Sequence, residues 1–88
     1  MSLVGIVMRI KSTAKIKLGT NIKHLIEQQN LKKSNIIREM QLLGLPMTKQ
    51  RLYKLENNLA NFTAEEILIL SQILNCDIYE FFKYTDEI

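Results

Sequence analysis

The stretch TKQRLYKLEN, residues 48–57, decides the architecture that we expect for this chain. Thr48 is a good N-cap, because its hydroxyl can accept a hydrogen bond from a free N–H of the first helical turn, and it predicts a helix from Lys49 to about Asn57. Leu52 and Leu55 are the only aliphatic residues of this helix, and they fall on one side at about 100° per residue. The helix is therefore expected to lie on the surface, with most of its circumference in water.

The opposite side of this helix carries groups that can hydrogen-bond to DNA. A glutamine amide can form two bonds with adenine, a lysine ammonium can reach the acceptors of guanine, and an α-helix fits the major groove. No acidic residue occurs from Gln41 to Leu55, which favours a DNA-binding face over the polar, solvated surface that most helices simply have. The outward-facing residues are Gln50, Tyr53, Lys54 and Asn57, flanked by Lys49 and Arg51.

Two helices are predicted before this stretch, and each ends at a residue that tolerates a left-handed backbone. Apolar residues recur with helical spacing from Gly19 to Asn30 and again from about Lys33 to Leu43. Asn30 is a plausible end for the first helix, and Gly44 for the second, which Pro46 prevents from continuing. The apolar stripes are Leu18, Ile22, Leu25 and Ile26, then Ile36, Ile37, Met40 and Leu43.

Two more helices are predicted after a loop at 57–61, where three asparagines compete with helical hydrogen bonding. Thr63 and Glu66 have the spacing of a capping box, which predicts a helix from about Ala64 to Asn75. Asp77 and Glu80 repeat this spacing before a short fifth helix. That fifth helix carries Ile78, Phe81 and Phe82.

The chain is therefore expected to form one all-α domain of five helices, at 18–84. An N-terminal arm at 1–17 precedes it, and a tail at 85–88 follows it. Within the arm, Leu3–Ile10 is apolar and partly β-branched, so the arm is open to three interpretations: flexible, strand-like or a helical extension. A single domain is also what 88 residues allow.

The composition excludes several classes of protein. One cysteine cannot form an internal disulfide, and one histidine without CxxC or HxxxH spacing predicts no metal site. With no glycine-rich phosphate loop and no nucleophile spaced to the histidine, we expect no catalytic residue and no cofactor. No apolar run approaches the ~20 residues that cross a bilayer, and no signal-peptide pattern is present, so we expect a cytoplasmic protein without a membrane partner.

The charges divide unevenly along the chain. Residues 1–54 hold eleven of the twelve lysines and arginines and two of the nine acids, a net charge of +9. Residues 55–88 hold one lysine and seven acids, a net charge of −6. This polarity suggests a basic face for a polyanion and an acidic face turned away from it, although an unevenly charged, solvated surface would explain it equally well.

From Leu18 to Phe82 the chain resembles the Cro/cI-type phage repressors, the xenobiotic-response-element family of helix-turn-helix proteins. The resemblance covers about three quarters of the chain and includes the Leu55-Glu56-Asn57 end of the third helix. It implies a compact phage-repressor-like fold, binding to double-stranded DNA, and a homodimer on paired half-sites. The other matching residues are Leu18, Gly19, Ile22, Leu31, Ile36, Met40, 48–54 and 70–78.

The resemblance also implies which residues would touch DNA. Gln50 and Lys54 match the base-reading positions of the third helix, with Lys49 close to them. Lys32 and Lys33 match the place where the start of the second helix meets the DNA backbone. The other residues that we expect at the DNA backbone are Thr48, Arg51 and Asn57.

Three departures from the family pattern carry expectations of their own. Seven residues lie between Met40 and Thr48, which resembles a subgroup with a lengthened connection between the second and third helices. Ile26 replaces an arginine that often pairs with the glutamate at Glu56, so Glu56 pairs with Arg38 or Arg51 or stays exposed. Ile37 replaces the usual alanine, which predicts a wider separation of the two central helices.

The function expected from these features is sequence-specific binding of duplex DNA by a repressor-like transcriptional regulator. The alternative is a protein-interaction module, such as an antitoxin or adaptor, that binds a toxin or regulator through its aromatic C-terminal end. Phe81, Phe82 and Tyr84 would form this end, and they could equally be core residues or a dimer interface. A role at a membrane surface is a third and weaker interpretation.

Overall fold

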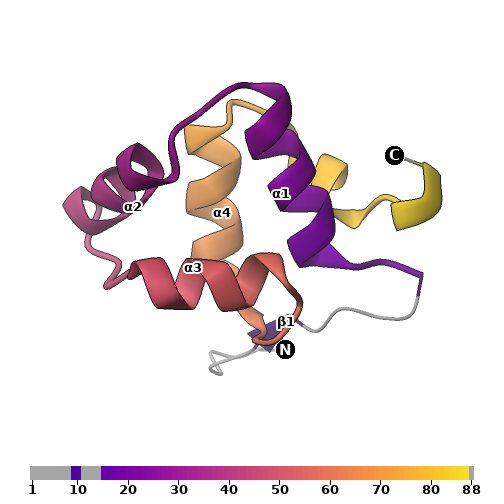
Figure 1. Ribbon diagram of the computed structural model, residues 1–88, viewed down its shortest axis with the longest axis horizontal. Helices are drawn as coiled ribbons and strands as arrows, with labels where there is room; N and C mark the ends of the chain where they lie inside the picture. Colours follow the sequence, from indigo (N-terminus) through magenta and orange to yellow (C-terminus); the bar gives the residue numbers. More distant parts are fainter. Residues whose placement is uncertain (1–8, 11–14, 88) are drawn as a thin grey trace, which may run out of the picture.

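The computed structural model describes residues 9–10 and 15–87, and most of this part is helical. Residues 1–8, 11–14 and 88 lie outside the described part, and so does most of the predicted arm. Figure 1 shows α3 running across the lower end of the helical domain. The elements are β1 (Arg9–Ile10), α1 (Leu18–Gln28), α2 (Lys33–Leu42), α3 (Lys49–Glu56), β2 (Phe62–Thr63), α4 (Ala64–Ile73) and the 3-10 helices η1 (Ile78–Phe82) and η2 (Thr85–Glu87).

The four α-helices in the described part of the chain end in the same backbone motif. The residue after each C-cap has a positive φ: Asn30 (57°), Gly44 (94°), Asn58 (60°) and Asn75 (51°). Its N–H and the following N–H donate to carbonyls of the last turn, as Leu31 N does to Ile26 O at 3.2 Å. These are the two bonds of a Schellman motif, in which Gly and Asn are favoured because they tolerate the left-handed conformation. The predicted helix ends at Asn30 and Gly44 are therefore confirmed.

The predicted starts of two helices are also confirmed, and a third is wrong. Thr48 accepts a hydrogen bond from Arg51 N at 3.1 Å, and Thr63 forms a complete capping box with Glu66. Asp77 instead accepts from Tyr79 N at 3.0 Å, and no box forms because the backbone continues as the tighter 3-10 helix η1. The expected fifth α-helix is thus a five-residue 3-10 helix.

One hydrophobic core joins the helices. α3 contacts both α1 and α2, α2 contacts α4, and η1 contacts α1 and α4. The side chains of Leu52 and Leu55 on α3 are buried, and so is that of Phe81 on η1. Phe81 is therefore a core residue, whereas Tyr84 is exposed. The other buried apolar residues are Leu18, Ile22, Ile26, Ile36, Met40, Met47, Phe62, Ile67, Leu70 and Leu74.

A small sheet was not part of the all-α expectation. β1 pairs antiparallel with β2, so that Arg9 lies opposite Thr63 and Ile10 opposite Phe62. Figure 1 shows β1 at the same lower end of the molecule as α3. The described end of the predicted arm is thus strand-like and joined to the domain.

The predicted boundaries at residues 17 and 85 do not separate independent segments. Thr85 N donates to Lys15 O at 2.9 Å, and Lys17 N donates to Thr85 Oγ1 at 2.7 Å. These bonds hold the residues before α1 against the C-terminal 3-10 helix η2. Residues that were assigned to the arm and to the tail therefore contact each other.

Candidate nucleic-acid interface

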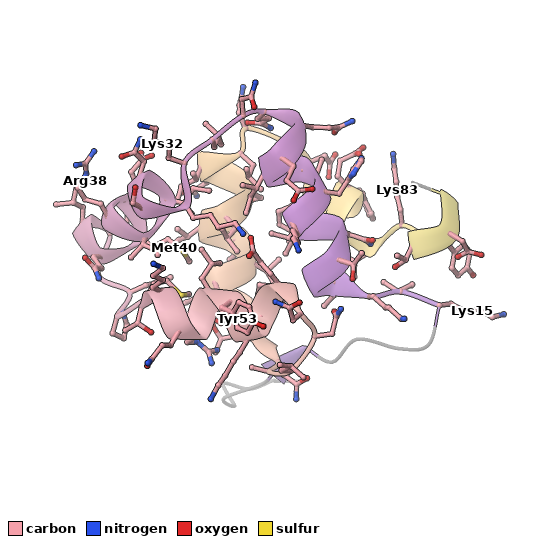
Figure 2. All side chains as sticks on the ribbon, in the orientation of Figure 1. Lys15, Lys32, Arg38, Met40, Tyr53 and Lys83 are labelled. Carbon is pink, nitrogen blue, oxygen red and sulfur yellow. The ribbon has the colours of Figure 1, made fainter. Side chains whose placement is uncertain are left out.

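The outer face of α3 has the composition expected of it. Leu52 and Leu55 are buried, whereas the side chains that point away from them are exposed to solvent. Figure 2 shows Tyr53 on the open side of the helix, and its side chain is 62% exposed. No acidic residue belongs to this exposed face, because the one acid of α3, Glu56, is buried. The exposed residues of α3 and its C-cap are Lys49, Gln50, Tyr53, Lys54 and Asn57.

A groove of about 540 Å³ runs between α2 and α3, and residues from the start of each helix contribute to its lining. Lys33 and Ser34 come from the first turn of α2, and Thr48 and Lys49 come from the start of α3. Helix N-termini carry free N–H groups and a partial positive charge, so both turns favour an anion such as phosphate. The remaining lining residues are Ile37, Gln41, Leu52, Tyr53 and Glu56.

The turn between α2 and α3 is held by a contact that the sequence did not predict. Gln41 Nε2 donates a hydrogen bond to Met47 O at 2.7 Å. The Met47 side chain is buried in the core, so the residue directly before Thr48 is anchored on both its backbone and its side chain. The lengthened connection is therefore a fixed turn in the structure, and it sets the position from which α3 starts.

Arg51 does not point freely from α3, although it was expected at the DNA backbone. Its guanidinium binds Glu66 through two bonds, Nε to Oε2 at 2.7 Å and Nη2 to Oε1 at 2.8 Å. Nη2 also donates to Asn61 O at 3.2 Å. Hydrogen bonding to Glu66 raises the pKa of Arg51. The guanidinium thus joins α3 to the start of α4, a contact between residues 15 positions apart that no local sequence pattern predicts.

Glu66 serves two purposes at once. Its Oε1 accepts from Thr63 N at 2.8 Å as part of the capping box, and both its oxygens accept from Arg51. Burial alone would raise the pKa of this carboxyl, but the hydrogen bonds from Arg51 and Thr63 and the charge of Arg51 outweigh burial and lower it. Glu66 therefore stays ionised at neutral pH, with Arg51 as its ion-pair partner.

Glu56 has a partner that was not among those expected. Its Oε1 lies 2.8 Å from Lys33 Nζ, while its side chain is only 2% exposed. Arg38 instead donates to Asn35 Oδ1 at 3.2 Å, and Arg51 is committed to Glu66. The expectation of Arg38, Arg51 or solvent was wrong, because Lys33 at the start of α2 comes closer to the end of α3 than either arginine. Glu56 Oε2 has no hydrogen-bond partner among the described residues.

These ion pairs change how the uneven charge of the sequence is distributed in space. Glu56 and Glu66 belong to the acidic half of the chain, but each neutralises a cation of the basic half. The expected simple division into a basic and an acidic face is therefore wrong for these two acids. Within the described part of the chain, Lys32, Lys49 and Lys54 form no ion pair and remain available to an anionic ligand.

The other predicted contact residues keep part of their hydrogen-bonding capacity. The Thr48 hydroxyl accepts the N-cap bond, which leaves its O–H free to donate. Asn57 Nδ2 donates to Tyr53 O at 2.8 Å, and the Asn57 side chain is exposed. Figure 2 shows the Lys32 side chain beside the start of α2, pointing away from the body of the domain. The structure thus brings Lys33, Thr48 and Lys49 to one groove, and Gln50 and Lys54 to the neighbouring outer face.

One residue at this surface, Leu59, was not predicted from the sequence. Leu59 is 69% exposed and lines a second depression together with Lys49, Gln50, Tyr53 and Lys54. Its N–H donates to Lys54 O at 2.8 Å, so it is held beside the last turn of α3. The Asn57–Asn58 pair, which predicts a helix end just before Leu59, was the signal that could have placed it there.

The described residues include no group of three His, Cys, Asp or Glu that could hold a metal ion. No helix in this part of the chain is long and apolar enough to cross a bilayer. Comparison with protein-family models, curated proteins and solved structures finds no match to this chain.

Proposed function

We propose that this chain binds duplex DNA sequence-specifically, with α2, the connecting turn and α3 acting as a helix-turn-helix motif. The observation that carries the proposal is the outer face of α3, which exposes only polar, cationic and aromatic side chains while its one acid is buried. A helix of this kind suits the major groove, where amide and ammonium groups can bond to base edges. In this proposal the protein is a cytoplasmic, repressor-like transcriptional regulator.

Each contact residue has a role that follows from its position. Gln50 and Lys54 read base edges from the exposed face of α3, together with Lys49. Lys32, Thr48 and Asn57 hold the DNA backbone, and Lys33 contributes while it also pairs with Glu56. Arg51 supports α3 through Glu66 and is not assigned to the backbone, because its Nε and Nη2 donors bond inside the protein.

A homodimer would place two copies of α3 on paired half-sites, as helix-turn-helix proteins commonly do. The described C-terminal end offers Tyr79, 75% exposed, and Tyr84, 49% exposed, as aromatic surface for such an interface. Exposed tyrosines are enriched where proteins meet. Phe81 cannot contribute, because it is buried in the core.

The experiment is a titration of duplex DNA at several salt concentrations. If each subunit neutralises about four phosphates, the logarithm of the binding constant falls with the logarithm of salt at a slope near −3.6 per subunit. A flat salt response, or no binding at low salt, would contradict the proposal.

Sequence reading is tested by Gln50→Ala on a selected site and on a scrambled one. The variant is expected to lose about 1–3 kcal/mol on the selected site and much less on the scrambled one, since phosphate contacts persist. Gln72→Ala is the matched control, because Gln72 is an exposed glutamine on α4. Equal losses on both DNAs would show that α3 is not the reading helix.

A protein-interaction module, such as an antitoxin or adaptor, is the second candidate. The exposed Tyr79 and Tyr84 favour it, because they would anchor a partner protein. Stable co-purification with a toxin or regulator that is lost in a Tyr79→Ser, Tyr84→Ser double variant, without affinity for DNA, would establish this function instead.

A further inference from the structure

Leu59 differs from Leu31 and Leu45, the residues at the equivalent place after α1 and α2. In a Schellman motif this residue commonly packs on an apolar side chain of the last turn. For Leu31 and Leu45, the last-turn residues that accept their N–H bonds are Ile26 and Met40, and both are buried in the core. For Leu59 the corresponding residue is Lys54, and the Leu59 side chain is left 69% exposed beside the outer face of α3.

The position of Leu59 is fixed by the turn that precedes it. Asn58 has a φ of 60°, accepts from Gly19 N at 3.1 Å and donates to Thr20 Oγ1 at 2.9 Å. Leu59 N then donates to Lys54 O at 2.8 Å. Because α1 and α3 both hold this turn, the backbone of Leu59 is fixed, and little backbone conformational entropy is lost when Leu59 binds a ligand.

Leu59 and Tyr53 line a depression beside α3 together with three polar or cationic residues. The other lining residues are Lys49, Gln50 and Lys54, so no acid borders it among the described residues. Two cations and an amide beside exposed apolar groups fit a nucleic-acid base better than the apolar face of a protein. In the major groove, thymine alone presents a methyl group together with an O4 acceptor.

We propose that Leu59 and Tyr53 select thymine by contact with its C5-methyl group, near the C-terminal end of α3. This inference rests on the proposed DNA binding and deepens it by naming a base and two further specificity-determining residues. A lysine or glutamine of the same depression, Lys54 or Gln50, donates to the O4 acceptor of that thymine. The methyl contact accounts for an exposed leucine among the lysines, which phosphate binding alone does not explain.

Uracil substitution tests the inference, because uracil lacks only the methyl group of thymine. Each thymine of a site selected from random DNA is replaced singly by uracil, and the full chain is titrated against each duplex. At one thymine per half-site, we expect uracil to weaken binding about three- to fivefold, the effect of one buried methyl group.

Two variants connect that effect to the named residues. Leu59→Ala is expected to lose a similar factor on the thymine site and to bind the thymine and uracil duplexes equally, as is Tyr53→Ala. Leu68→Ala is the matched control, because Leu68 is an exposed leucine on α4 that lines neither depression. It is expected to keep the full preference for thymine, and circular dichroism checks that all three variants are folded.

The possible failures are distinguishable. If the chain binds DNA with a steep salt dependence but no thymine responds to uracil, the inference is overturned and the proposed function stands. A uracil effect that persists in both Leu59→Ala and Tyr53→Ala, or a selected site without thymine, overturns it as well. Absence of salt-dependent DNA binding would overturn the proposed function and this inference together.

Discussion

Lys33, the first residue of α2, and Glu56, the last residue of α3, form an ion pair with 2.8 Å between Nζ and Oε1. Each charge stands at the unfavourable end of its own helix dipole, since cations are disfavoured at N-termini and anions at C-termini. The pair offsets both placements and ties the two helices of the proposed motif together. Glu56 would therefore compete with a DNA phosphate for the Lys33 ammonium.

We expect Lys33→Ala to lower the free energy of unfolding by about 1–2 kcal/mol, because it leaves the buried Glu56 carboxylate without its cation. Lys33 is half-exposed, which keeps this below the cost of breaking a fully buried pair. Urea denaturation measures the change, and the neighbouring Lys32→Ala is the control with an expected change under about 0.5 kcal/mol. Equal effects of the two variants would show that the pair contributes nothing to stability.

The same two lysines are expected to differ in the salt dependence of DNA binding. Lys32→Ala removes an unpaired ammonium and is expected to reduce the slope by about 0.9. Lys33→Ala is expected to reduce it less, because Glu56 already neutralises part of that charge. A larger reduction from Lys33→Ala would mean that the lysine leaves Glu56 when DNA binds.

Gly19→Ala is expected to destabilise the domain by about 1–3 kcal/mol, although alanine is the better helix former. A Cβ at this position would overlap the carbonyl oxygen of Leu55 and lie 2.9 Å from Asn58 Oδ1. The end of α3 would have to move away from α1, so DNA affinity is expected to fall as well. Thermal unfolding and DNA titration measure the two effects.

Gly44 is the control for that substitution, because a Cβ there meets no atom within 4 Å and its φ is +94°. Gly44→Asn is expected to cost less than Gly19→Ala, since Asn occupies the equivalent position after the other three α-helices. If Gly19→Ala is neutral, the close approach of α1 and α3 is not a constraint on the fold.

Stability is expected to fall in acid partly through Glu66. Its pKa is lowered in the folded protein from its ordinary value of 4.5, so the ionised form contributes stability above that value, which is lost as pH falls through the lower folded pKa. Glu66→Gln is expected to cost about 1–3 kcal/mol at neutral pH and to flatten the stability curve between about pH 5 and pH 3. Denaturation over this range measures it.

Glu65→Gln serves as the matched control for Glu66→Gln. Glu65 is the neighbouring acid in the first turn of α4, but it is exposed and has no ion pair among the described residues. Its variant is expected to keep the pH dependence of the unsubstituted protein. An unchanged curve for Glu66→Gln would mean that Arg51 does not hold that carboxylate in solution.

Leu52→Ala separates folding from DNA reading on the same helix. Leu52 is buried against the core, so the substitution is expected to cost about 2–4 kcal/mol and to abolish binding by unfolding the domain. Gln50→Ala, on the exposed face, is expected to leave the melting temperature within a degree or two. The contrast is measured by circular dichroism, and an unstable Gln50→Ala would remove the distinction between the two faces.

The local features of the fold could be predicted because they depend on residues close together in the chain. The spacing of Leu52 and Leu55 placed the polar side of α3 outward, and Thr63 with Glu66 marked the start of α4. Asn30 and Gly44 marked two helix ends by their tolerance of positive φ. Each of these depends on hydrogen bonds or periodicity within a few residues, which sequence order determines directly.

The tertiary structure alone decided which charges meet and which apolar side chains stay open. Lys33 and Glu56 are 23 positions apart, and Arg51 and Glu66 are 15 apart, so their pairing depends on how the helices cross. The tertiary structure likewise pairs β1 with β2 and leaves Leu59 exposed beside Lys54. Sequence determined the faces of the helices, because periodicity is local; tertiary packing determined the partners, because an ion pair requires two distant segments to meet within a few ångströms.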